Sequence, residues 1–226
     1  MWPALVGGRY IFRMPQITLK RDQSLGEEIA NSISHGVGFL GAVAVTPIMI
    51  VKATGAAAVV GASIFGATMM FLYLSSTLYH AFPKNRAKQV FQIFDHSGIF
   101  LLIAGTYTPF SLTVLPAAWG WTIFGVVWGL AALGIVIKSV KGAKAGKLST
   151  ALYLGMGWIA VIAFKPLWDN LAGWGFFWLV MGGVMYSMGV IFFAYDHRIK
   201  YSHFVWHLFV LAGTACHVVT VIEYVY

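Results

Sequence analysis

The chain has 226 residues, of which 59% are hydrophobic and only 10% are charged, and its mean hydropathy is +0.79. Because soluble domains carry about 25% charged residues and keep much of their surface in water, this composition excludes a soluble globular domain, and it also excludes intrinsic disorder. The net charge of +8 is spread in short bursts between apolar stretches, which is typical of loops in a polytopic membrane protein, so we expect no nucleic-acid partner.

Residues 1–31 form the one substantial polar stretch and are expected to be a cytoplasmic tail. Its opening run, Met1–Val6, is too short for a signal peptide and has no basic region before it. Further on, Ser24-Leu25-Gly26-Glu27 has the spacing of a capping box and predicts the start of a short helix.

Beyond the tail, seven apolar stretches each approach the ~20 residues that a helix needs to cross a bilayer. They lie at about 33–52, 56–80, 93–115, 119–138, 149–165, 174–195 and 203–225. The fifth is the weakest, because Lys165-Pro166 ends it early. No gap between them holds a soluble domain, so residues 32–226 are expected to form one all-α, seven-helix transmembrane domain.

The distribution of lysine and arginine predicts the orientation of this domain. Of the fifteen lysines and arginines, only Lys52 and Lys165 fall on one side of the membrane. The tail and the loops between spans two and three, four and five, and six and seven carry the other thirteen: Arg9, Arg13, Lys20, Arg21, Lys84, Arg86, Lys88, Lys138, Lys141, Lys144, Lys147, Arg198 and Lys200. We therefore expect a cytoplasmic N-terminus and an external Tyr226.

Ionisable groups at membrane depth are costly, so each one is a candidate functional residue. This topology brings all but one of them to the cytoplasmic boundary, since they stand at the starts of odd spans or the ends of even spans. They are Glu28, His35, His80, Asp95, His96, His203 and His207, with His217 lying deeper.

The sequence predicts a metal site among these residues. His203 and His207 are four residues apart, which stacks both imidazoles on one helix face. Such a pair often arises by coincidence, but His80 at the same depth supplies a third ligand and leaves a fourth position for water, as in catalytic zinc sites. Asp95 is placed to orient or deprotonate that water, and Ser76, one turn before His80, faces the same side.

The remaining histidines have simpler interpretations. His35 is interpreted as a hydrogen-bonded core residue rather than a ligand, and His96 as a packing residue that faces away from Asp95. His197 is expected to be solvated in a loop. His217 lies ten residues, or about 15 Å, beyond His207, too deep to share the metal, and is expected to be buried and hydrogen-bonded.

Four motifs resemble those of the progestin and adipoQ receptor family, whose bacterial members are called hemolysin III proteins. The resemblance covers about residues 24–226. The motifs are Glu28-Ile29-Ala30-Asn31-Ser32-Ile33-Ser34-His35, then Ser76-Thr77-Leu78-Tyr79-His80, then Phe94-Asp95-His96-Ser97-Gly98-Ile99 followed by Gly105-Thr106-Tyr107-Thr108-Pro109, and Ser202-His203-Phe204-Val205-Trp206-His207 with the later His217.

The resemblance implies seven helices with the N-terminus inside and a zinc ion near the cytoplasmic face. By similarity, His80, His203 and His207 would be its ligands and Asp95 would reach it through water. The wider superfamily includes alkaline ceramidases and has been proposed to consist of metal-dependent membrane hydrolases, while the hemolysin name implies cytolysis or a role in membrane homeostasis. The short tail departs from the hormone receptors, so hormone recognition is not carried over.

Two functions follow as hypotheses. In the first, a zinc hydrolase of the cell membrane cleaves the amide or ester bond of a membrane lipid, with Asp95 as general base and Ser76 stabilising the oxyanion. In the second, zinc is structural in a receptor-like or membrane-homeostasis protein. Cytolytic pore formation finds no support in the sequence, which has no amphipathic β pattern and no polar stripe to line a channel.

Overall fold

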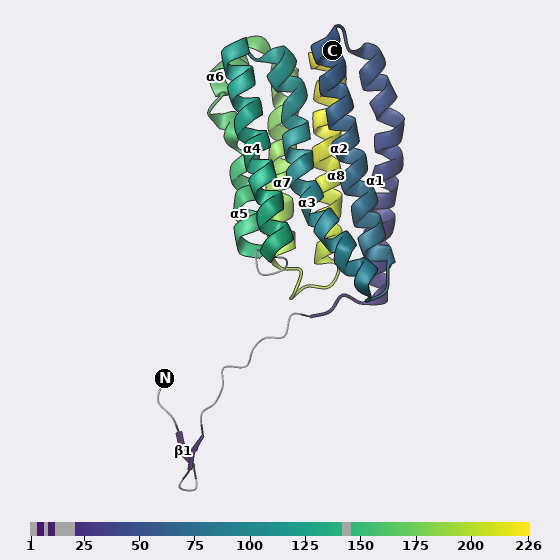
Figure 1. The fold of residues 1–226 in the computed structure, drawn as a ribbon, viewed down its shortest axis with the longest axis vertical. Coiled ribbons are helices and arrows are strands. Elements are labelled where there is room, and N and C mark those ends of the chain that lie inside the picture. Colours follow the sequence, from purple (N-terminus) through teal and green to yellow (C-terminus); the bar gives the residue numbers. More distant parts are fainter. Residues whose placement is uncertain (1–3, 7–8, 12–20, 142–145) are drawn as a thin grey trace.

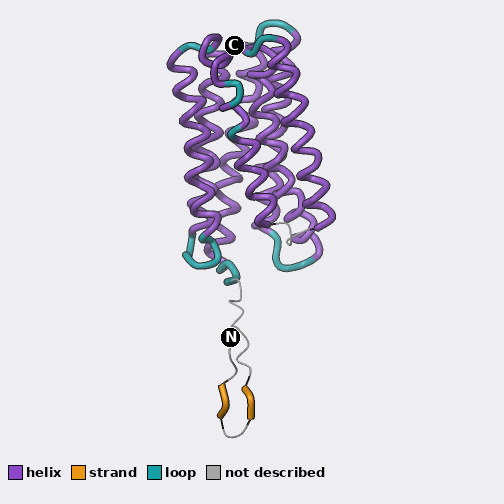
Figure 2. The backbone as a smooth tube through the Cα atoms, turned by 90° about the vertical axis from the view of Figure 1, so that its left-hand side faces the viewer, coloured by secondary structure: helices purple, strands orange, loops and turns teal. Residues whose placement is uncertain are grey.

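The computed structural model describes residues 4–6, 9–11, 21–141 and 146–226. Part of the expected tail, namely residues 1–3, 7–8 and 12–20, lies outside the described residues, as does Lys144. Within the tail, β1 (Ala4–Val6) pairs antiparallel with β2 (Arg9–Ile11), with Leu5 opposite Tyr10. The rest is a bundle of helices along a common axis, with α1 beginning at one end and the C-terminus at the other (Figures 1 and 2).

The helices follow the order that the apolar stretches predict. They are α1 (Leu25–Lys52), α2 (Ala56–Ala81), α3 (Arg86–Pro109) with the π-helical turn η1 (Phe110–Val114), α4 (Ala117–Lys141), α5 (Gly146–Gly157), the 3-10 turn η3 (Ile159–Val161), α6 (Phe164–Asn170), α7 (Gly173–Ala194), and α8 (Ser202–Thr220) with the π-helical turn η4 (Val221–Val225). Among the described residues, six helices are long and apolar enough to span a membrane, and α5 with α6, counted as one broken span, makes seven. The all-α membrane fold is confirmed.

Helix α1 begins at Leu25, inside the segment expected to be tail, rather than near residue 33. The capping box forms as predicted: the Glu27 N–H donates to the Ser24 hydroxyl (3.4 Å) and the Ser24 N–H donates to the Glu27 carboxylate (2.9 Å). The short helix and the first span are therefore one continuous helix, because no breaker separates them.

The fifth span breaks earlier than Lys165-Pro166 suggested. The chain bends by 54° between its two halves, while Pro166 lies in the first turn of α6, where its missing N–H disrupts nothing. At the break, the Tyr107 hydroxyl donates to the Gly157 carbonyl (2.8 Å) and accepts from the Ala160 N–H (2.9 Å). A neighbouring helix thus satisfies backbone groups that a bilayer would leave unpaired.

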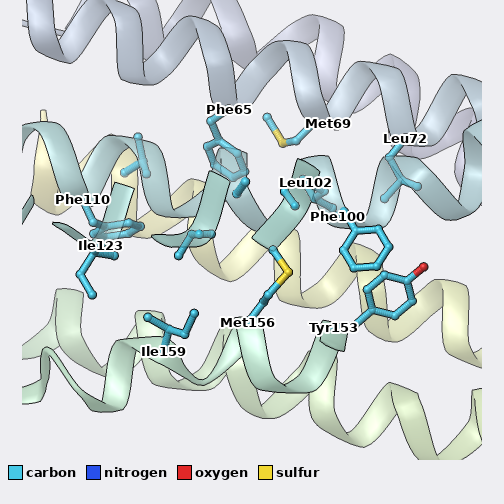
Figure 3. Packing of buried hydrophobic residues seen from close by; sticks show 14 of the residues in the cluster. Phe65, Met69, Leu72, Phe100, Leu102, Phe110, Ile123, Tyr153, Met156 and Ile159 are labelled. Atoms are coloured by element: carbon cyan, nitrogen blue, oxygen red, sulfur yellow. The ribbon is translucent and has the colours of Figure 1, made fainter. Parts of the chain in front are cut away.

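Helices α2, α3 and α8 are the most buried of the spans, and α1, α4 and α7 lie at the periphery. Figure 3 shows the core between α2, α3 and α5, where Leu72, Phe100, Tyr153 and Met156 pack side by side. Large apolar side chains on the outer helices are exposed, as expected when lipid is the solvent. The inner helices are the ones that carry the candidate site.

Candidate metal centre

Three histidines from two helices far apart in the chain meet at the end of the bundle where α1 begins. His80 lies in the last turn of α2, and His203 and His207 lie in the first turns of α8. Their candidate ligand nitrogens all lie within 4.8 Å of one another, and His80 and His207 are 3% and 1% exposed. The predicted trio therefore forms a buried cluster that could hold a metal ion.

A carboxylate orients His80. Its Nδ1 lies 2.7 Å from Oε2 of Glu28, and the other oxygen of Glu28 accepts a hydrogen bond from Lys88 Nζ (2.8 Å). Lys88 also donates to the carbonyl oxygens of Tyr79 and Phe82, which fixes its position. The Nε2 of His80 is buried without a hydrogen-bond partner among the described residues, so it is free to ligate a metal.

Each of the other two imidazoles also has a polar neighbour at Nδ1. His207 Nδ1 lies 3.1 Å from the Ser34 hydroxyl and 3.2 Å from the Asn31 carbonyl. His203 Nδ1 lies 3.4 Å from a carboxylate oxygen of Asp196. Hydrogen bonds at Nδ1 of His80 and His207 leave Nε2 of these two rings for a metal, which is the usual way in which outer partners orient histidine ligands. In His203, Nδ1 lies at ion-pair distance from Asp196 but makes no hydrogen bond to the described residues.

Asp95 and Ser76 lie beside the cluster. Asp95 is buried and lines a small cavity of about 20 Å³ together with His203 and His207, but it is not among the atoms that converge within 4.8 Å. Ser76 is fully buried; its hydroxyl is close enough to interact with the Asp95 carboxyl but makes no close hydrogen bond in the described part of the chain. Their catalytic roles stay predictions.

A second, much larger cavity adjoins this site. Its volume is about 430 Å³, and its wall is almost entirely apolar, built from α2, α3, the broken span, α7 and α8. The two cavities share four wall residues: Leu72, Ile99, Trp206 and Val210. An apolar space of this size next to a buried polar cluster is typical of a small-molecule site.

Comparison with known proteins gives the family. The family model described as "Haemolysin-III related" matches residues 23–218. The chain belongs to this family. It is 42% identical to Hemolysin-3 of Bacillus cereus over 94% of this chain and 98% of that protein, and 44% identical to the Hemolysin-3 homolog of Bacillus subtilis over 85% and 91%.

A human relative is more distant: the monocyte to macrophage differentiation factor of Homo sapiens is 29% identical over 72% of this chain and 69% of that protein. No solved structure matches at a significant level. The bacterial relatives and the helices together identify a multi-pass membrane protein of the haemolysin-III related family.

In this family member, the first-span motif supplies partners for the histidine cluster, a role that the sequence alone did not indicate. Glu28, Asn31 and Ser34 are three residues apart, a spacing that places them along one face of α1. That face meets His80 and His207. The spacing of the motif was the signal that could have found them.

Two residues that the sequence places in loops lie close to the site. Lys138, counted among the loop charges, is 4% exposed and interacts electrostatically with Asp95. Asp196, the neighbour of His197 in the α7–α8 loop, approaches His203. Both lie at helix ends, where the sequence alone does not separate a side chain that turns inward from one that faces water.

The contacts of three other histidines differ in part from those expected from the sequence. His35 makes no hydrogen bond in the described part of the chain and stacks on His207, with ring centroids 3.6 Å apart. His96 lines the same small cavity as Asp95 instead of facing away, and its Nδ1 lies 2.7 Å from the Gln92 carbonyl. His217 is buried and outside the cluster, as expected, but it has no hydrogen bond to any described residue.

The start of α8, which carries His203, is tied to α1. The Arg21 guanidinium donates two hydrogen bonds to Glu27 (2.6 and 2.7 Å) and reaches the Asp196 carbonyl (3.4 Å). Glu27, 2% exposed, also accepts from the Tyr201 N–H (2.8 Å). Tyr201 is the one non-glycine residue with positive φ (59°) in the described chain, so this clamp holds the left-handed turn that opens α8.

Proposed function

We propose that this protein is a zinc-dependent membrane hydrolase that cleaves an amide or ester bond of a lipid. The observation that carries the proposal is the buried cluster of His80, His203 and His207, whose candidate ligand nitrogens all lie within 4.8 Å of one another. Three protein ligands leave a fourth tetrahedral position for water, whereas structural zinc sites are usually closed by four.

The donor set fits zinc. Imidazole nitrogen suits this metal, and the buried Nε2 of His80 has no partner among the described residues. A buried polar atom without a partner is costly, and a metal ion supplies one. The carboxylates of Glu28, Asp95 and Asp196 around the cluster balance the added positive charge.

When bound, zinc lowers the pKa of a water molecule to about 7 and polarises a carbonyl group. Asp95 accepts a proton from the attacking water and returns it to the leaving amine or alcohol of the lipid. Ser76 donates a hydrogen bond to the carbonyl oxygen as negative charge develops there. Burial of both residues excludes bulk water and strengthens each interaction.

The large cavity supports a lipid substrate. Its apolar wall can hold an acyl chain, and four wall residues shared with the small cavity would bring the carbonyl end of that chain close to the cluster. The bent span α5–α6 forms part of the wall, and Trp158, Val161 and Phe164 around its break are also exposed at the outer surface of the bundle. This supports entry of the lipid from the bilayer.

The test is zinc content measured together with hydrolysis of fluorescent ceramide and of an ester of the same acyl length, on purified protein in micelles. We expect about one zinc per chain and turnover in the wild type, and zinc without turnover in Asp95→Asn. His197→Ala, a change of a histidine in the α7–α8 loop outside the cluster, should match the wild type. Zinc with no turnover of either lipid in the wild type would instead favour structural zinc in a receptor-like or membrane-homeostasis protein.

A further inference from the structure

The large cavity contains a histidine whose Nδ1 is buried without a hydrogen-bond partner among the described residues. His217, on α8, lines the cavity, is 5% exposed and makes no hydrogen bond to any described residue. Its ring packs beside Tyr186, with centroids 5.5 Å apart, and against Gly182, where any side chain would collide with it. Close packing on α7 therefore fixes the imidazole in place at the wall.

The hydroxyl groups of the same wall are different, because each already has a partner. Tyr186 shares a hydrogen bond with Thr214, and Tyr153 donates to the His96 carbonyl. The other bonds run from Thr106 to Leu102, from Tyr107 to Gly157 and from Ser187 to Gly183. The neighbouring hydroxyls already use their hydrogen bonds within the protein. His217 can therefore offer a hydrogen bond to a ligand.

Buried polar groups without partners are few in native proteins, so this one needs an explanation. An ordered water is a poor one, since a buried water needs two to four polar partners and apolar cavities stay dry. The hydroxyls of this wall already have partners within the protein. A ligand that brings an apolar body and one polar atom satisfies the imidazole without hydrating the cavity.

We propose that His217 recognises a hydroxyl group carried far along an acyl chain. His217 lies ten residues beyond His207, or about 15 Å along α8. A chain whose carbonyl lies at the histidine cluster passes this depth well before its end. A neutral imidazole donates from one nitrogen and accepts at the other, which matches a hydroxyl, itself both donor and acceptor.

This inference deepens the proposed function by naming the substrate class, a lipid with a hydroxylated acyl chain. It rests on that function only in placing an acyl chain in the cavity, and binding can be measured without turnover. One hydrogen bond made in a dry site gives about a tenfold preference over the unsubstituted chain.

The experiment compares binding of 12-hydroxystearate and stearate to full-length protein in micelles, by competition with a fluorescent fatty acid. Since the hydroxyl also changes partitioning into the micelle, His217→Leu supplies the reference. For each protein we take the Kd of stearate divided by the Kd of 12-hydroxystearate. This ratio is expected to be about ten times larger in the wild type than in His217→Leu, and the quotient of the two is the corrected ratio. Ser63→Ala, which removes a hydroxyl bonded within α2 and away from both cavities, should give the wild-type ratio.

Zinc content and lipid hydrolysis are measured on the same samples. A corrected ratio near one, or the absence of binding by either acid, overturns the role of His217. A ratio near ten in protein that hydrolyses no lipid would keep the hydroxyl site and reject the hydrolase, so the two failures are distinguishable.

Discussion

The carboxylate of Glu28 lies 2.7 Å from Nδ1 of His80, although 52 residues separate the two in the chain. This contact links the first-span motif to the second-span histidine and turns the Nε2 of His80 toward His203 and His207. The same carboxylate is held by Lys88, from the start of α3. Three helices therefore converge to set the orientation of one candidate ligand.

Loss of this carboxylate should weaken the metal site without abolishing it. Glu28→Gln keeps the shape of the side chain but removes the charge that makes His80 a stronger ligand, so zinc affinity should fall about 10–100-fold. Competition with a chromophoric chelator measures it. Glu223→Gln, an exposed carboxylate paired with Lys52 at the opposite end of the bundle, is the control and should retain wild-type affinity. Equal affinity in both variants would mean that Glu28 does not orient the ligand.

Alanine at any of the three clustered histidines should remove zinc from the purified protein. Each replacement deletes one of three ligands, a larger loss than that of an outer partner. His217→Ala is the matched control, because it deletes a buried histidine of the same helix that lies outside the cluster. Metal analysis of purified His203→Ala and His217→Ala tests the predicted ligand set. Loss of zinc in His217→Ala would show that this set is wrong.

The sequence predicted much of this site because two simple constraints act on it. Apolar runs of bilayer length give the spans, and the positions of lysine and arginine give each span a direction, which together bring His80, His203 and His207 to one depth. The structure shows that these three meet. Depth, however, says nothing about the rotation of each helix. That is why Glu28 was noticed as a costly residue but not assigned to His80.

Other features depend on packing that no single segment encodes. Lys138 ends an apolar run and has the pattern of a loop cation, yet it is buried and interacts electrostatically with Asp95. The bend of the fifth span is stabilised by Tyr107, which comes from another helix, while Lys165-Pro166 is tolerated within α6. In both cases the deciding partner lies far away in the chain.

The clamp between α1 and the start of α8 should contribute measurably to stability. Glu27→Gln leaves Arg21 and the Tyr201 N–H with a weaker, neutral acceptor in a buried position, which should lower the free energy of unfolding by about 1–3 kcal/mol. Thermal unfolding in micelles measures the change. The control is Asp22→Asn: Lys84 lowers the pKa of Asp22 through a hydrogen bond, but this ion pair is exposed and so worth little. Equal effects of the two substitutions would show that the clamp has no special role.

The last prediction concerns orientation: the N-terminus and the loops near Arg86, Lys144 and Arg198 should be cytoplasmic, and Tyr226 external. The structure adds a physical argument, because the two basic residues at the end that carries Tyr226 are both paired with acids. Lys52 contacts Glu223 (3.2 Å) and Lys165 contacts Asp169 (2.6 Å).

In the described loops, lysine and arginine gather instead at the end where α1 begins, which is the bias that cytoplasmic loops carry. Alkaline phosphatase, which is active only outside the cytoplasm, should be active when fused after Tyr226 and inactive when fused at Lys144. Activity at Lys144 would reverse the topology and place the histidine cluster at the external face.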